Sequence, residues 1–120
     1  MALEIEFLPP FEKHLSNVLK KFPKAEKQIC DDIRSLTRNQ EGFLFPGFGD
    51  HQVRKLRIPV KAYKISKQKG LRLIYAVKGN RVIPLYIYHK ANYKCEDKVI
   101  AEIKAALKEF INEKSSPDLT

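Results

Sequence analysis

The chain has 120 residues and carries 23 Lys and Arg against 14 Asp and Glu, a formal net charge of +9. This length predicts one domain with a modest core, which the 43% of hydrophobic residues is sufficient to form. The composition argues against a membrane-spanning protein, because no apolar stretch approaches the length of a membrane span. The acidic Glu4 and Glu6 are unlike the cationic start of a signal peptide, so we expect a cytoplasmic protein.

The two cysteines, Cys30 and Cys95, are far apart and form neither a CxxC pair nor a metal-ligand spacing. We expect both to be reduced packing residues. The sequence has no carboxylate cluster that would hold a divalent cation, so neither a metal ion nor a cofactor is expected.

The first part of the chain predicts one strand and a helical hairpin. Residues 3–7 alternate apolar and acidic side chains, which is typical of a half-buried strand. Apolar residues from Leu15 to Phe22 recur at helical spacing, and Pro23 stops that helix before a second one that begins at Lys24.

The next segment, residues 39–52, is rich in glycine and predicts a loop. Its aromatic residues Phe43, Phe45 and Phe48 have two interpretations. Exposed rings could stack on nucleic-acid bases, whereas rings folded back would close the core, which is the commoner arrangement in small domains.

The second half predicts an antiparallel sheet followed by a helix. A basic loop over residues 60–70 and a turn containing Gly79 connect the strands, because glycine readily adopts the positive φ angle that a tight hairpin needs. Asp97 is a typical N-cap for the last helix. The three strands are expected at residues 53–59, 71–77 and 81–88.

The order strand, two helices, three antiparallel strands and helix predicts an α+β domain of two layers. The helices are expected to cover one face of a small antiparallel sheet and to leave the other face open for a partner. We expect a single domain over residues 1–114 and a frayed tail over residues 115–120.

The positive charge is concentrated in the middle of the chain. Residues 51–95 contain twelve Lys and Arg and no Asp or Glu, whereas the remainder holds 11 basic and 14 acidic residues. A field of one sign attracts a polyanion such as nucleic acid, an anionic membrane or an acidic protein segment. The alternative is a solvated surface that only aids solubility, but such surfaces usually mix both signs.

Alternation along the strand at 71–77 assigns Arg72 to one face and Leu73 and Tyr75 to the other. Because the second set is bulkier, we expect it to face the helices and Arg72 to point out of the open face. Arg72 could serve a partner there, or be a strand charge that extends to water.

The run from Arg54 to Pro59, the stretch Lys69-Gly70-Leu71-Arg72-Leu73-Ile74-Tyr75, and the stretch Ile87-Tyr88-His89-Lys90 occur in this order before a terminal helix. In this arrangement the sequence resembles the RelE/ParE toxin superfamily over nearly its whole length. The resemblance implies a RelE-like fold and the toxin of a type II toxin–antitoxin system. RelE-like toxins cleave mRNA at the ribosomal A site, inhibit translation, and are held inactive by a cognate antitoxin protein.

The resemblance also implies site residues. Arg72 matches the central-strand arginine, and Lys90 and Tyr93 fall where the family keeps basic and tyrosine groups, although Tyr93 precedes the last helix and is matched less well. The loop at 60–70 is longer than in compact RelE toxins. The expected RNA-binding residues are Arg54, Lys55, Arg57, Lys61, Lys64, Lys67 and Lys69.

RNA cleavage by the neighbouring 2′-hydroxyl needs a base, charge stabilisation on the phosphate and an acid, and no metal. Arg72 suits the phosphate because its fork can bind two oxygens. His89 titrates near neutrality, so it could be acid or base, but a partly buried structural histidine is an equal alternative. The expected catalytic residues are Arg72, His89, Lys90 and Tyr93.

Two other function classes stay open. A ParE-like toxin would inhibit a topoisomerase by binding it and would cut nothing. A non-catalytic RNA-binding module ranks last, because the sequence lacks the stacked aromatic pattern of an RRM and the GxxG loop of a KH domain.

Overall fold

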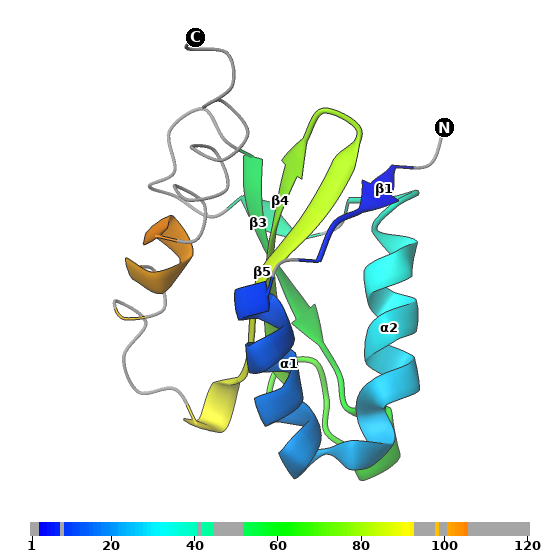
Figure 1. Ribbon diagram of the computed structural model, residues 1–120. Helices are drawn as coiled ribbons and strands as arrows, with labels where there is room; N and C mark the ends of the chain where they lie inside the picture. Colours follow the sequence, from blue (N-terminus) through cyan, green and yellow to red (C-terminus); the bar gives the residue numbers. More distant parts are fainter. Residues whose placement is uncertain are drawn as a thin grey trace, which may run out of the picture.

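A five-stranded mixed sheet organises the computed structural model, which describes residues 3–7, 9–40, 42–44, 52–92, 98 and 101–105 (Figure 1). Within these residues the strand order is β1-β5-β4-β3-β2. The bounds are β1 (Glu4–Ile5), α1 (Pro9–Lys21), η1 (Pro23–Ala25), α2 (Glu26–Ser35), β2 (Phe43–Leu44), β3 (Gln52–Ile58), η2 (Lys61–Tyr63), β4 (Leu71–Lys78), β5 (Arg81–His89) and η3 (Lys90–Asn92).

The predicted helical hairpin is present, and prolines set its limits. α1 begins at Pro9 and Pro10, because proline lacks only an N–H that the first helical turn leaves unpaired anyway. Pro23 ends the first helix, and a short 3-10 turn over Pro23–Ala25 leads into α2.

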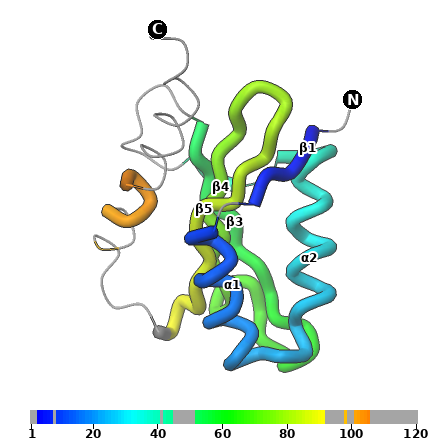
Figure 2. Tube along the Cα trace, in the orientation of Figure 1, coloured from blue at the N-terminus to red at the C-terminus, as the bar shows by residue number. Residues whose placement is uncertain are grey.

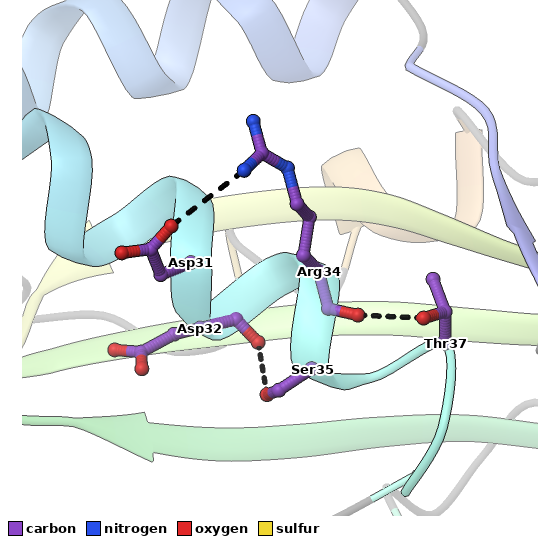
Figure 3. A network of polar contacts seen from close by, with 5 residues as sticks. All are labelled: Asp31, Asp32, Arg34, Ser35 and Thr37. Carbon is purple, nitrogen blue, oxygen red and sulfur yellow. Dashed lines mark hydrogen bonds and ion pairs between the residues drawn. The ribbon is translucent and has the colours of Figure 1, made fainter.

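Polar side chains close the C-terminal end of α2 (Figure 3). Ser35 donates a hydrogen bond to the backbone oxygen of Asp32, and Thr37 donates one to that of Arg34, each at 2.7 Å. The Arg34 guanidinium lies 3.7 Å from the Asp31 carboxylate. Such bonds satisfy carbonyls that have no partner within the helix. The chain then leaves α2 and continues to β2.

β4 and β5 form the central hairpin, and Gly79 has the positive φ of 60° that its turn requires. The pairing shifts by one residue between Ile74 and Tyr75, whose partners are Tyr86 and Pro84. A bulge of this kind changes which side chains share a face. Ile83 and Ile87 therefore lie on opposite faces of the sheet, because Ile83 pairs with Ala76 whereas Ile87 pairs with Leu73.

The main core lies between the two N-terminal helices and one face of the sheet (Figure 2). Leu73 and Tyr75 are fully buried in it, as the alternation predicted. The helices contribute Phe11, Val18 and Phe22 from the first segment and Ile29 and Ile33 from α2.

The opposite face of the sheet is also covered, so the expectation of an open face is wrong. Ile74, Ala76 and Ile83 are buried there, and Ile103 of the helical residues 101–105 is fully buried. Figure 1 shows the helical segment 101–105, in orange, on the other side of the sheet from α2. Covering a second apolar face removes more apolar surface from water than a two-layer arrangement would.

The α+β fold class is confirmed, with two additions at the sheet edges. β1 pairs with β5 in parallel, and β2 pairs antiparallel with β3 inside the segment expected to be a loop. Phe43 of β2 is 67% exposed, so it does not fold back on the core. The expectations for Phe45, Phe48 and residues 115–120 lie outside the described residues. No helix among the described residues is long and apolar enough to cross a membrane.

Candidate nucleic-acid interface

A groove of about 470 Å³ runs along the outer edge of β3. It lies where β3 extends beyond its short partner β2, whose pairing involves only Arg54 and Lys55 of β3. Four cations line it, and all four are among the expected RNA-binding residues: Lys55, Arg57, Lys61 and Lys67. One acid, Asp32 of α2, reaches the groove, and its carboxylate accepts a hydrogen bond of 3.0 Å from Gln28.

Strand alternation separates the three basic residues of β3. Lys55 and Arg57 pair with Ile74 and Arg72, so they share the face on which Arg72 lies. Arg57 is exposed and its guanidinium stands 5.7 Å from the ring of Phe43, a distance typical of a cation–π contact.

Arg54 lies on the other face and is not part of this group. It pairs with Tyr75, and its Nη1 donates to the backbone oxygen of Gly42 at 3.2 Å. Its Nε is buried without a hydrogen-bond partner. We therefore expect Arg54 to hold the β2 segment rather than to contact a ligand.

The basic loop over residues 60–70 is fixed at its start by Gln28 of α2. The Gln28 side chain donates to the backbone oxygen of Pro59 at 2.6 Å and accepts from the backbone N–H of Lys61 at 2.9 Å. Val60 and Ile65 form a bridge across the loop. These contacts give the loop a defined shape although it has little regular structure.

Two more contacts fix the middle and the end of this loop. The Tyr63 hydroxyl accepts a hydrogen bond from the backbone N–H of Lys24 at 3.2 Å, and its ring meets Phe22 edge-on. A Cβ atom at Gly70 would lie 2.2 Å from the Ile58 carbonyl oxygen, so only glycine fits there. The loop thus presents its four exposed lysines from a fixed backbone: Lys61, Lys64, Lys67 and Lys69.

Arg72 supports this loop from inside the protein. Its face was predicted correctly, but the expectation that it points into solvent is wrong, because only 5% of the residue is exposed. Its guanidinium donates to the backbone oxygens of Lys67 at 2.9 Å, Gln68 at 2.8 Å and Leu71 at 3.2 Å. Three of its five N–H groups therefore hold the chain that leads into β4.

The surroundings of Arg72 lower the pKa of its guanidinium. Burial is the largest cause, the positive charge of Arg57 lowers the pKa further, and Tyr88 raises it. An arginine keeps its proton under all ordinary conditions, so the group stays cationic. The partial negative charges of three backbone carbonyl oxygens stabilise that cation.

His89 lies on the face of the sheet that α1 and α2 cover, and Arg72 lies on the opposite face. Its ring meets Phe22 edge-on, and its Nδ1 is 3.3 Å from the Lys21 ammonium. Burial lowers the pKa of His89 from its ordinary value of 6.5, and the charge of Lys21 lowers it further, while a hydrogen bond with the backbone of Lys69 raises it. This placement favours the structural alternative for His89, and the structure does not bring it together with Arg72.

Lys90 is exposed and belongs to η3, directly after β5. Its backbone N–H donates to the carbonyl oxygen of Gly70 at 3.1 Å, so the end of β5 is tied to the end of the basic loop. Tyr93 lies outside the described residues, and its expected catalytic role stays a prediction.

Sequence reasoning missed the residues that hold the groove. Gln28 and Tyr63 were not singled out, because each acts through a contact with a distant segment that no local pattern indicates. Phe43 was recognised only as a loop aromatic. Phe43 and Leu44 are adjacent apolar residues, and this pair could have indicated a short strand.

No protein-family model matches the sequence, and no curated protein matches it. Among solved structures, the chain is similar to a copper-bound mutant toxin from Helicobacter pylori, with 17% sequence identity and a TM-score of 0.43. The similarity covers 74% of this chain and 96% of that chain. Identity and TM-score at this level assign neither a family nor an activity.

Proposed function

We propose that the protein is a RelE/ParE-type toxin that cleaves mRNA at the ribosome and is neutralised by a cognate antitoxin. The observation that carries this proposal is the convergence of Lys55, Arg57, Lys61 and Lys67 in one groove. A groove with several fixed cations suits the closely spaced phosphates of a nucleic-acid strand. The sequence resemblance supplies the choice of mRNA as the strand.

In this proposal Arg57 makes the forked contact with the reacting phosphate. It is exposed and stands at the groove, whereas Arg72 is buried and bonded to the loop backbone. Arg72 then positions Lys67 rather than touching RNA, because it holds the carbonyl of that residue. Charge developing on the phosphate as the 2′-hydroxyl attacks would be stabilised by Arg57 and Lys55.

The catalytic roles of Arg72, His89, Lys90 and Tyr93 rest on the resemblance and on general chemistry. Contacts with backbone carbonyls argue against direct catalysis by Arg72, and contacts with Lys21 and Phe22 argue against it for His89.

The cationic groove also favours a second candidate, a ParE-like toxin that inhibits a topoisomerase by binding. Such a protein needs a charged surface but no acid or base. The engagement of Arg72 and His89 in structural contacts fits that role.

Primer extension on mRNA from cells that express the protein distinguishes the two candidates when it is combined with a DNA-supercoiling assay on the purified protein. We expect new mRNA ends at sites of translation and unchanged supercoiling. Arg57→Ala should lower the cleavage rate by roughly a hundredfold, as loss of one preorganised donor typically does. Arg34→Ala is the matched control, because Arg34 is an exposed arginine of α2 that contacts only Asp31 among the ion pairs described.

Inhibited supercoiling without new mRNA ends would replace the nuclease with the second candidate. If neither effect is found in cells that make folded protein, both candidates fail. Equal cleavage by Arg57→Ala and wild-type protein would keep the nuclease but remove Arg57 from its chemistry.

A further inference from the structure

A second cleft, of about 220 Å³, lies at the outer edge of β5, whereas the cationic groove lies at the outer edge of β3 on the opposite side of β4. β1 pairs with β5 only at Arg81 and Val82, so the rest of this edge faces α1. Side chains of α1 and of the last part of β5 line the cleft. None of the expected RNA-binding residues lines it, and of the expected catalytic residues it includes His89.

Aromatic rings make up most of the wall of this cleft. His14 stacks on Tyr86 with ring centroids 3.8 Å apart, and Tyr86 meets Tyr88 edge-on at 5.9 Å. His89 closes the end next to Phe22. Tyr86 and Phe22 are buried, whereas His14, Tyr88 and His89 are partly exposed, so these three rings present surface to the cleft.

The rim of the cleft carries polar groups of another kind. Asn17 is exposed on α1 and offers an amide that can donate and accept hydrogen bonds. The Lys21 ammonium stands one helical turn further on, beside His89. Aromatic walls with an amide and an ammonium at the rim match a nucleobase, which has two flat faces and a polar edge.

Tyr88 connects this cleft to the surface that carries the groove. It pairs with Arg72 across β4 and β5, and it raises the pKa of that residue. Arg72 pairs in turn with Arg57 of β3. Two strand spacings of about 4.8 Å separate β3 from β5, and the groove and the cleft lie at the outer edges of these strands, so they are more than about 10 Å apart.

We propose that the cleft formed by His14, Asn17, Lys21, Tyr86 and Tyr88 binds one base of a single-stranded RNA whose phosphates lie in the groove of β3. The inference rests on the proposed function in that the ligand is RNA. Its volume admits one planar group and is smaller than the 300–1,000 Å³ of sites for larger ligands. The cleft adds a contact that depends on the base, whereas the groove recognises phosphate only.

The test compares two 2′-O-methyl trinucleotides that the protein cannot cleave, one complete and one with an abasic middle position. Both carry the same charge, so their difference in affinity reports contacts with the base. We expect the abasic probe to bind wild-type protein about tenfold more weakly, because stacking of one base on an aromatic ring is worth roughly that factor.

Asn17→Leu should remove this difference, because leucine takes away the amide and fills part of the cleft without adding a ring. Ser16→Leu is the matched control, since Ser16 is exposed on the same helix and does not line the cleft. It should keep the tenfold difference. Circular dichroism checks that both variants are folded.

Equal binding of the two probes to wild-type protein would overturn the base site and leave the proposed function standing. The same holds if Asn17→Leu keeps the full difference, because the base would then bind elsewhere. Absence of binding by either probe at low salt would overturn the RNA-directed function and the base site together.

Discussion

Arg72 is a buried cation whose charge is stabilised by the dipoles of backbone carbonyls. Its guanidinium meets three backbone carbonyls in one short segment, Lys67, Gln68 and Leu71. Burying a charge is costly unless hydrogen bonds replace those to water, and a forked group can supply several at once. The hydrogen bonds that replace water around Arg72 also fix the shape of the basic loop.

Replacing Arg72 should destabilise the protein. Arg72→Ala leaves buried carbonyls without a donor, so we expect the free energy of unfolding to fall by roughly 1–3 kcal/mol, measured by urea denaturation. Arg72→Lys should recover only part of this loss, because one ammonium cannot serve the same three acceptors. Arg57→Ala, at an exposed position of the neighbouring strand, should change stability by less than about 0.5 kcal/mol. An Arg72→Ala protein as stable as wild type would show that the loop does not depend on these bonds.

His89 should make the stability depend on pH. Its pKa in the folded protein is lowered by burial and by Lys21, whereas in the unfolded chain it has its ordinary value of 6.5. As the pH falls below about 6.5, the unfolded chain takes up a proton before the folded protein does. The free energy of unfolding should therefore fall until the pH passes the folded pKa, and then level off.

Thermal melts of wild type and His89→Gln between pH 8 and pH 5 measure this contribution. The variant should lose less stability on acidification than wild type. His14, whose pKa is also lowered mainly by burial, should contribute to the slope that remains. Identical slopes for both proteins would mean that His89 titrates at its ordinary pKa.

At the scale of elements, the basic loop behaves as a preformed platform. Contacts from three directions hold it: Gln28 of α2 at its start, Tyr63 against η1 in the middle, and Arg72 of β4 at its end. A cationic loop held in place binds phosphates without first losing conformational freedom. This arrangement explains why a segment with little regular structure can line a groove.

Loss of the Gln28 contacts should loosen the start of this loop. Gln28→Ala removes the acceptor for the Lys61 N–H and the donor to Pro59. We expect hydrogen exchange of the Lys61 amide to quicken by about fivefold, which corresponds to the loss of one hydrogen bond. Lys27→Ala, at the exposed neighbouring position, should leave that exchange rate unchanged. Equal rates in both variants would show that other contacts are sufficient to fix the loop.

Local patterns predicted the elements because periodicity is a property of neighbours in sequence. The helix stripes and the turn at Gly79 have the predicted place, and the strand predicted at residues 71–77 is present as β4 (Leu71–Lys78). The partners of these elements depend on distant segments, so the parallel pairing of β1 with β5 and the pairing of β2 with β3 could not be inferred.

The candidate site was predictable in its charges and unpredictable in its geometry. Alternation assigned Arg72 to the correct face, but its burial depends on the loop that folds back over it. The bulge opposite Ile74 shifted the side chains of β5 by one position, and no feature of the sequence indicated it. Seven cations were expected to bind RNA, and the structure brings four of them into one groove: Lys55, Arg57, Lys61 and Lys67.

At the scale of the molecule, basic and acidic residues are separated along the chain. All residues from 52 to 92 lack an acidic group, whereas acids such as Glu26, Asp31 and Asp32 occur on α2. The attraction for a polyanion is therefore directional, and it is strongest along β3 and the basic loop. A field of this kind guides the approach of a charged partner as well as its final position.

This division predicts how binding of single-stranded RNA depends on salt. If about five cations meet phosphates, the slope of log K against log salt should be near −3.5, because each contact contributes about −0.7. Lys61→Ala/Lys67→Ala removes two groove cations and should reduce the slope to about −2. Lys20→Ala/Lys27→Ala removes the same net charge from exposed positions on α1 and α2 and should leave the slope near its wild-type value. Fluorescence anisotropy over a range of salt concentrations measures all three slopes. If the two double variants change the slope equally, net charge rather than the groove attracts the RNA.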